Sequence, residues 1–467
     1  MTKQIFNPYL PSYEYIPDGE PRVFDDRLYI FGSHDKFKGK WFCENDYVTW
    51  SAPLNDLSSW RYEGVIYRKD QDSRKGNLFA PDVIQGLDGK YYLYYSKDDS
   101  SVIGVAVSDK PAGKYKYLGE VHYKNGKAVG DDENEYFMFD PSILIDGNRI
   151  WLYSGSSKRK TTTNIKRNMV GCTVMELEED MITVKTMPRP VLYGKNGWHN
   201  ESFFEGPSAR KIGELYYLIY PVRNGSGLFY ATSKFPDKGF VKRGRIHSPS
   251  DYGINGHSFW NLAYSKSNNH GGLVNLNGKW FIFDHRNSDN SGFSRQGVAE
   301  QIVIEKDGSI KQVESTSYVL NAKPLIASGE YPSYIACNIM SKKIFWIRNS
   351  KKVPYITQDK EDGNTDAISY ITEIKNGCTI GYKYFDFDYN QGKITFFYRG
   401  KGNGRIILSV DENMKKVIGK GSISSSENWA KVDIYFKINE GILPLYFTYQ
   451  GKEMIEFLKF KIEKTND

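Results

Sequence analysis

The chain has 467 residues, which is more than one ordinary hydrophobic core holds, so we expect two domains. Its 63 Lys and Arg residues against 56 Asp and Glu residues give a net charge of only +7, and no basic block is long enough to predict nucleic-acid binding. No run of about 18 apolar residues predicts a membrane span. The N-terminus lacks the apolar segment of a signal peptide, so we expect a cytoplasmic protein. The four cysteines are far apart and show no CxxC spacing, which argues against a disulfide framework or a zinc site.

One sequence pattern occurs five times in the first two thirds of the chain. Each copy has a polar or acidic residue ahead of a strand, then a tight turn, then a second strand rich in aromatic residues. The copies start 60 to 66 residues apart, at Pro21, Pro81, Pro141, Pro207 and Gly271. A repeat of this length holds one four-stranded sheet, and a radial array of such sheets is a β-propeller. We therefore predict an all-β fold in which residues 1–325 form a five-bladed β-propeller.

A different series of strands follows the repeats. Residues 319–345 contain Pro324, Gly329 and Pro332 and are expected to form a linker. Beyond them, short strands separated by Gly, Asn and Asp turns predict a second domain over residues 326–467, a jelly-roll-like β-sandwich. The expected strands cover residues 379–387, 393–398, 405–410, 429–436, 445–449 and 455–460.

The segments that lead into the first strand of each repeat carry the candidate chemistry. In a propeller these first strands line the central axis, so their lead-ins crowd one end of it. Asp18, Asp140, Glu205 and His270 are therefore expected to share one pocket. Hydrolysis of a glycosidic bond needs one protonated and one ionised carboxyl group, and a third acid raises the pKa of the proton donor. The alternative is that each acid is a turn residue that bonds its own backbone, but the shared repeat phase favours a common site.

The repeats as a set resemble glycoside hydrolase family 43. The matching motifs include Asn7-Pro8, residues 18–24, residues 79–82, residues 139–143 and residues 205–207, together with His270-Gly271 and His285-Arg286. The resemblance implies an inverting five-bladed propeller in which Asp18 is the general base, Glu205 the general acid and Asp140 the residue that tunes and orients the acid. This chain has Asp18-Gly19-Glu20 where the family commonly has Asp-Pro-Ser, so Glu20 competes with Asp18 for the role of base.

The resemblance also implies binding residues around these acids. His270 is similar to an axial histidine that often holds a hydrated calcium ion, although a structural histidine is an equal alternative, because calcium prefers oxygen ligands. Arg286 is similar to a sugar-binding arginine. Asp82 is either a substrate contact or a structural residue. His34, Trp50 and Trp198 are expected to form pocket walls. No cofactor is required, and a structural calcium in the channel is the one metal considered.

Residues 370–462 diffusely resemble family 6 carbohydrate-binding modules. In such modules a tyrosine and a tryptophan sandwich a sugar, and Tyr382 and Trp429 are the nearest equivalents. Packing of both side chains in a module that only supports the propeller is the favoured alternative.

The residues and the resemblance together predict an exo-acting hydrolase of O-glycosyl bonds. The expected substrate is a plant-type oligosaccharide from which a terminal pentose is released, with α-L-arabinofuranose placed first. β-D-xylose and another furanose such as galactofuranose are the alternatives. A propeller that binds sugar without cleaving it is the competing function from another class. The sequence does not determine the oligomeric state.

Overall fold

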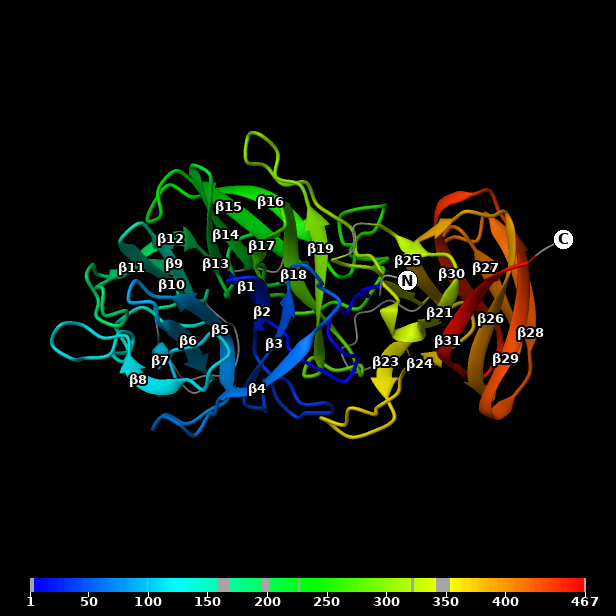
Figure 1. The fold of residues 1–467 in the computed structure, drawn as a ribbon, viewed down its shortest axis with the longest axis horizontal. Helices are drawn as coiled ribbons and strands as arrows, with labels where there is room; N and C mark the ends of the chain where they lie inside the picture. The colour runs from blue at the N-terminus through cyan, green and yellow to red at the C-terminus, as the bar shows by residue number, and fades with distance from the viewer. Residues whose placement is uncertain are drawn as a thin grey trace.

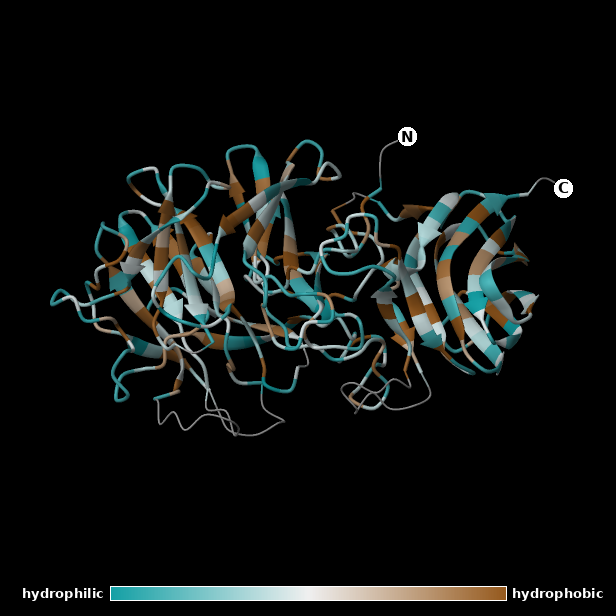
Figure 2. Ribbon diagram, turned by 90° about the horizontal axis from the view of Figure 1, so that it is seen from below, coloured by the Kyte–Doolittle hydropathy of each residue, from teal (hydrophilic) through white to brown (hydrophobic). Residues whose placement is uncertain are grey.

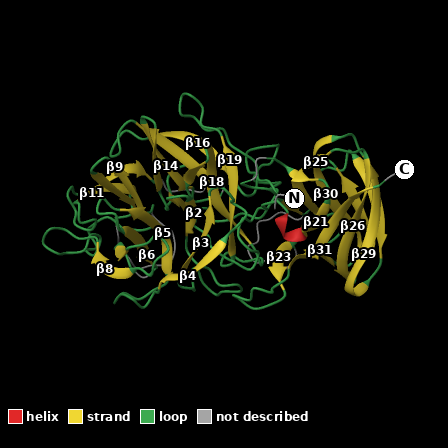
Figure 3. Ribbon diagram, viewed as in Figure 1, coloured by secondary structure: helices red, strands yellow, loops and turns green. Residues whose placement is uncertain are grey.

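The protein is built from strands and loops in two parts, a propeller and a sandwich (Figure 1). The computed structural model describes residues 4–98, 100–157, 168–194, 201–225, 227–320, 323–341 and 353–465. Across these ranges the one helix is the 3₁₀ helix η1 (Ser333–Ile335) at the junction of the two parts (Figure 3). No helix in the described ranges is long and apolar enough to cross a membrane. The predicted all-β fold is confirmed.

The described residues of the propeller form five antiparallel sheets that follow one another along the chain. Blade one contains β1 (Glu20–Phe24), β2 (Arg27–Phe31), β3 (Tyr47–Pro53) and β4 (Arg61–Tyr67). Blade two contains β5 (Leu78–Gln85), β6 (Tyr91–Lys97), β7 (Gly104–Ser108) and β8 (Lys116–Glu120). Blade three contains β9 (Ser142–Asp146), β10 (Arg149–Ser154), β11 (Gly171–Leu177) and β12 (Arg189–Tyr193). Blade four contains β13 (Ser208–Ile212), β14 (Leu215–Pro221), β15 (Leu228–Ser233) and β16 (Val241–His247), and blade five contains β17 (Leu273–Leu276), β18 (Lys279–Asn287) and β19 (Arg295–Ile302).

Neighbouring blades pack against each other through apolar side chains on both faces of their strands. Between blades three and four, for example, Trp151 packs with Leu218 and Phe229 in one buried cluster. Similar clusters lie between the other neighbouring blades, and Figure 2 shows hydrophobic residues along the middle of the strands. Burying both faces explains why these strands are rich in aromatic and β-branched residues. The innermost strands β1, β5, β9, β13 and β17 consequently gather around one axis (Figure 1).

The N-terminal segment closes the ring beside β19. The side-chain amide of Asn7 donates to the Ala299 carbonyl at 2.9 Å and accepts from the Ala299 N–H at 3.1 Å, as a neighbouring strand would. It also donates to Oε1 of Glu300 at 3.0 Å. Glu300 is buried, and burial raises its pKa from 4.5 to about 8. Thr316 contacts the Glu300 carboxyl group through both its backbone N–H and its hydroxyl group, so a neutral glutamic acid links the two ends of the propeller.

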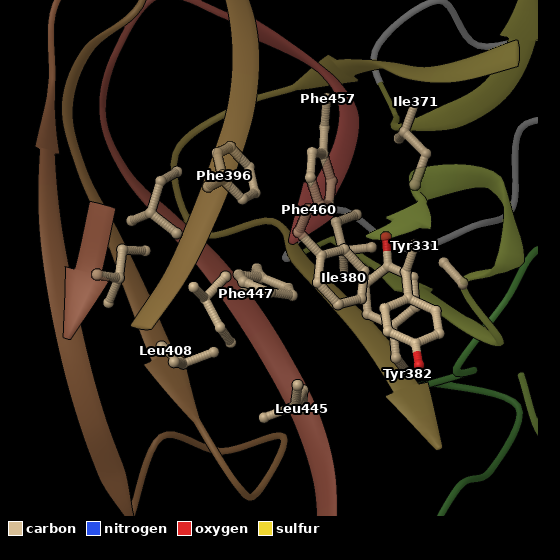
Figure 4. Packing of buried hydrophobic residues seen from close by; sticks show 14 of the residues in the cluster. Tyr331, Ile371, Ile380, Tyr382, Phe396, Leu408, Leu445, Phe447, Phe457 and Phe460 are labelled. Atoms are coloured by element: carbon tan, nitrogen blue, oxygen red, sulfur yellow. The ribbon is translucent and has the colours of Figure 1, made fainter. Parts of the chain in front are cut away.

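The sandwich contains two sheets that enclose one apolar core. One sheet contains β20 (Leu325–Ile326), β22 (Asn338–Met340), β25 (Thr379–Phe387), β27 (Asn403–Ser409), β28 (Val417–Ile423) and β30 (Gly441–Lys452). The other contains β21 (Gly329–Pro332), β23 (Tyr355–Gln358), β24 (Ser369–Ile374), β26 (Gln391–Gly400), β29 (Ser426–Lys437) and β31 (Ile455–Lys464). Phe396, Phe447, Phe457 and Phe460 stack between the sheets (Figure 4). All six strands expected from the sequence occur here.

The expected linker is largely part of the sandwich. Within residues 319–345 the short strands β20, β21 and β22 pair with β25 and β31, which lie far along the chain. The sandwich thus begins at Leu325, one residue before the expected boundary of 326. This segment also joins the two domains, because the Ile339 N–H donates to the carbonyl of Ala263 of the propeller at 2.7 Å, and the adjacent Tyr264 packs into the core of the sandwich.

Candidate active site

The lead-ins of the blades meet at one end of the propeller, which we call the mouth. Neighbouring strands within a blade are antiparallel, so the lead-in to the first strand and the loop between the second and third strands lie at the same end. Asp18, Asp140 and Gly206 have left-handed backbones with φ of 56°, 50° and 57°. Asp tolerates this conformation better than most residues, and Gly adopts it freely. The chain therefore turns sharply at the mouth just before it enters the axis.

Asp18 is a buried carboxylate held between two basic groups. Its Oδ1 lies 3.1 Å from Nη1 of Arg295 and 3.4 Å from Nδ1 of His285. Its backbone N–H also donates to His285 Nδ1, at 3.1 Å. Burial acts to raise the pKa of Asp18, but Arg295, His285 and His270 together outweigh it and hold the pKa below its ordinary value. Asp18 is therefore ionised at neutral pH, as a general base requires.

Arg295, at the start of β19, is a site residue that the sequence analysis missed. It is 2% exposed and also bonds Asp35 through Nε and Nη2, at 2.8 and 2.9 Å. Its pKa stays above the ordinary value, because these two carboxylates outweigh the effect of burial. The feature that could have pointed to Arg295 is its position directly after the loop 288–294, at the mouth end of the last propeller strand. Arg295, which lies outside the predicted motifs, is the largest of the charges that lower the pKa of Asp18, ahead of His285 and His270.

The lead-ins that carry Glu205 and His270 lie against each other at the mouth. A side chain built on Gly206, the residue after Glu205, would lie within 3.0 Å of the imidazole ring of His270, so only glycine fits there. Glu205 itself is half-buried. His270 also lowers the pKa of Asp18, so its ring lies near both Asp18 and the backbone of the lead-in that carries Glu205. Asp18 and Glu205 are thus brought to the same end of the axis.

A calcium ion at His270 would be held mostly by water molecules rather than by a cluster of protein ligands from the described residues. Its Nε2 atom is buried and has no hydrogen-bond partner among the described residues. The part of the chain that the structure describes contains no group of three His, Cys, Asp or Glu side chains able to hold a metal ion. A single imidazole is a poor match for calcium, which prefers six to eight oxygen ligands. No step of the reaction below uses calcium.

Asp140 lies at the mouth directly before blade three, next to Phe139. It is 4% exposed, and its N–H donates to Oγ of Ser96 at 3.2 Å. The ring of Phe139 lies 5.9 Å from that of Phe79. Burial raises the pKa of Tyr47, and the charges of Cys43, Asp140 and Asp18 raise it further, so Asp140 and Asp18 act on the same phenol. The topology of the blades places the lead-in of Asp140 at the mouth, and the role of Asp140 stays a prediction.

Glu20 and Asp82 lie deeper along the axis and are engaged in ion pairs. Oε2 of Glu20 accepts from Nη2 of Arg210 at 2.6 Å. Asp82 is fully buried and accepts from Arg22 Nε at 2.9 Å and from the Ile143 N–H at 2.9 Å. Both carboxylates are therefore used to join innermost strands. The contacts of Asp82 favour the structural alternative over a substrate contact. Glu20 is bound to Arg210, whereas Asp18 lies at the mouth, which favours Asp18 over Glu20 as the candidate base.

The mouth as a whole offers an ionised buried carboxylate, a half-buried one and a third acid. A set of this kind can activate water and protonate a leaving oxygen. The comparisons with known proteins agree with that chemistry: residues 16–310 match the profile of the family described as Glycosyl hydrolases family 43. The chain belongs to glycoside hydrolase family 43. It is therefore a glycoside hydrolase, as predicted.

Some relatives match this family 43 enzyme over nearly its whole length and others over about two thirds of it. A "Xylosidase/arabinosidase" of Thermoclostridium stercorarium is 43% identical, and the match covers 99% of each chain. A "Xylosidase/arabinosidase" of Bacteroides ovatus is 28% identical over 66% of this chain and 97% of its own. Among solved structures, a family 43 arabinoxylan arabinofuranohydrolase from Bacillus subtilis in complex with cellotetraose has a TM-score of 0.54 at 18% identity, and the match covers 98% of this chain and 97% of that one. This last likeness extends the shared fold to the second domain.

The structure of this family 43 enzyme places Arg286 away from the acids. Neighbouring residues of a strand point to opposite faces, and in β18 His285 points to Asp18. Arg286 consequently points the other way, where its Nη1 and Nη2 donate to the carbonyls of Ala336 and Tyr334, each at 2.6 Å. The expectation that Arg286 binds sugar is thus corrected. Arg286 joins the sandwich to the propeller, and Arg295 occupies the mouth.

The expected wall residues have structural partners in the family 43 propeller. His34 Nε2 lies 3.0 Å from Oε1 of Glu14, and the indole N–H of Trp50 donates to Oε2 of the same glutamate at 2.7 Å. Trp50 is 6% exposed and belongs to a buried cluster. These contacts tie the lead-in of blade one to its third strand. Trp198 lies outside the described residues.

In the sandwich of this family 43 enzyme, Tyr382 and Trp429 do not face each other. Tyr382 is fully buried, and its hydroxyl group donates to the Ser333 carbonyl at 2.9 Å (Figure 4). Trp429 lies on the outside of the other sheet, where the guanidinium group of Arg399 covers its ring at 4.3 Å. A sugar sandwiched between Tyr382 and Trp429 is therefore excluded by their positions, and the packing alternative holds for Tyr382.

Proposed function

We propose that this family 43 hydrolase is an inverting exo-glycosidase that releases a terminal pentose from plant-type oligosaccharides, with α-L-arabinofuranose as the first candidate. The proposal rests above all on Asp18, a buried carboxylate kept ionised by Arg295 and placed at the same end of the axis as Glu205. The relative from Thermoclostridium stercorarium, whose name includes arabinosidase, supports the sugar class.

The reaction follows from the roles of the three acids. Asp18 accepts a proton from a water molecule, whose oxygen forms a bond to the anomeric carbon. Glu205 donates its proton to the glycosidic oxygen as the bond from that oxygen to the anomeric carbon breaks. Asp140 keeps the general acid oriented and favours its protonated form through like-charge repulsion. Water attacks from the face opposite the leaving group, so the configuration of the sugar is inverted. Exchange of protons with solvent restores both carboxyl groups.

A second candidate is a β-D-xylosidase. The same relative carries xylosidase as well as arabinosidase in its name, and this observation favours either sugar in the same pocket. Both are pentoses, and the mechanism is unchanged. Discrimination between arabinofuranose and xylose depends on the shape of the pocket rather than on the three acids.

The test is a panel of nitrophenyl glycosides with the wild type, Asp18→Ala and Glu205→Ala. Wild type is expected to release nitrophenol from α-L-arabinofuranoside, β-D-xylopyranoside or both, and the ratio of kcat/KM decides between the candidates. Each variant is expected to lose about 10² to 10⁴ in kcat on a natural oligosaccharide. Proton NMR of the first product is expected to show the inverted anomer. Binding of sugar without any release would establish the non-catalytic alternative, and retention would refute the mechanism.

A further inference from the structure

The loop between β2 and β3 carries an exposed tryptophan at the mouth. By the topology of the blade this loop lies at the same end as Asp18. Trp41 is 51% exposed, although large aromatic side chains are usually mostly buried. The mechanism of the three acids does not use Trp41. An exposed aromatic ring beside an active site is a candidate contact for a ligand.

The ring of Trp41 is held in place from blade two. Its indole N–H donates to Oδ2 of Asp98 at 3.1 Å. Oδ1 of Asp98 accepts from the N–H of Asn77 at 2.8 Å, and the side chain of Asn77 donates to the Phe42 carbonyl at 3.0 Å. These hydrogen bonds connect Trp41 and the next residue, Phe42, to the same two residues of blade two. The exposed ring is thus fixed before any ligand arrives, which reduces the entropy lost on binding.

A short chain of contacts connects Trp41 to the catalytic carboxylate. The ring of Trp41 lies 5.6 Å from that of Phe42, and both rings contact Phe293, at 5.8 and 4.6 Å. The guanidinium group of Arg295 lies 5.0 Å from the centre of the Phe42 ring, and Arg295 bonds Asp18. Trp41 therefore lies one aromatic residue outward from the arginine that holds the base. It occupies the rim between the buried site and solvent.

We propose that Trp41 is the platform for the sugar on the leaving-group side of the scissile bond. This inference rests on the proposed function. A terminal pentose reaches buried Asp18 from the mouth, so the remainder of the oligosaccharide extends outward across the rim. The indole presents a flat apolar face to the C–H face of a pyranose ring, and its polar edge is already satisfied by Asp98. Trp41 thus recognises the sugar to which the pentose is attached and sets the preference for oligosaccharides over simple pentosides.

The experiment compares two substrates in three variants. The substrates are an oligosaccharide (xylotriose or arabinosylated xylotriose) and the corresponding methyl pentoside, whose leaving group is too small to stack. Trp41→Ala is expected to lower the ratio of kcat/KM between them about tenfold, and Trp41→Phe by less than about threefold. Phe235→Ala is the matched control, because Phe235 is 53% exposed in the turn between β15 and β16, at the opposite end of the propeller. This control is expected to leave the ratio unchanged.

Two outcomes would overturn the inference. An equal fall in kcat/KM on both substrates would mean that Trp41 only stabilises the loop between β2 and β3, which we call the rim loop. Unchanged kcat/KM on both substrates would mean that the leaving sugar passes elsewhere. Calorimetry separates this question from hydrolysis. In the Glu205→Ala background, adding Trp41→Ala is expected to weaken binding of the oligosaccharide about tenfold, and equal affinities would refute the platform. A wild type that cleaves neither substrate would refute the proposed function, while the binding measurement would still decide the role of Trp41.

Discussion

Replacing Arg295 by glutamine is expected to move the acid limb of the activity profile to higher pH. Nη1 of Arg295 lies 3.1 Å from Oδ1 of Asp18, and both side chains are almost wholly buried. At an effective dielectric constant of about 20, two unit charges at this distance attract by about 5 kcal/mol. Polar neighbours and water replace much of this attraction in the variant. A net loss of about 1.4 to 2.7 kcal/mol raises the pKa of Asp18 by about 1 to 2 units.

The assay is kcat/KM against pH for wild type and Arg295→Gln on one nitrophenyl pentoside. Asp18 must be ionised to act as the base, so a higher pKa removes activity at low pH first. Asp35→Asn is the matched control, because it removes the other carboxylate bonded to Arg295 and leaves the positive charge to Asp18. This control is expected to leave the acid limb in place or to move it to lower pH. Thermal melts verify that both variants fold, and an acid limb that stays in place in Arg295→Gln would refute the assignment of Asp18.

Three further predictions concern the framework of the site. Asp82→Ala leaves Arg22 buried without its partner and is expected to lower the free energy of unfolding by about 3 to 5 kcal/mol in denaturant titrations, whereas a loss confined to KM would indicate a sugar contact instead. Asp362→Ala removes the acceptor for the Phe37 N–H at 2.7 Å, so the rim loop loses about 1 kcal/mol of support from the sandwich, and KM for oligosaccharides is expected to rise while that of methyl pentosides changes less. Glu300, with its pKa raised from 4.5 to about 8, stays protonated in the folded protein while the unfolded chain ionises, so stability is expected to fall as the pH rises from about 4.5 to about 8. Glu300→Gln is expected to flatten that slope in melts across this pH range, and an unchanged slope would contradict it.

The sequence by itself determined the architecture of the propeller and the residues that lead into it. Strand alternation, aromatic content and turn residues are local features, and their recurrence at intervals of 60 to 66 residues is visible without a structure. The shared phase of Asp18, Asp140 and Glu205 placed them at one end of the axis for the same reason. Six of the longer strands of the sandwich were also predictable, because each satisfies a local pattern, whereas β28 was not predicted.

Only the tertiary structure decided which arginine serves the site and where the sandwich begins. Arg286 and Arg295 both lie at the mouth end of their strands, β18 and β19, and both are plausible by sequence. Because His285 faces Asp18, alternation along β18 turns Arg286 toward the sandwich, while the pairing of β18 with β19 places Arg295 on the face of His285. The short strands of residues 325–340 likewise exist only through pairing with β25 and β31, about 40 or more residues away. Such register and pairing depend on distant partners, and no local pattern in the chain encodes them.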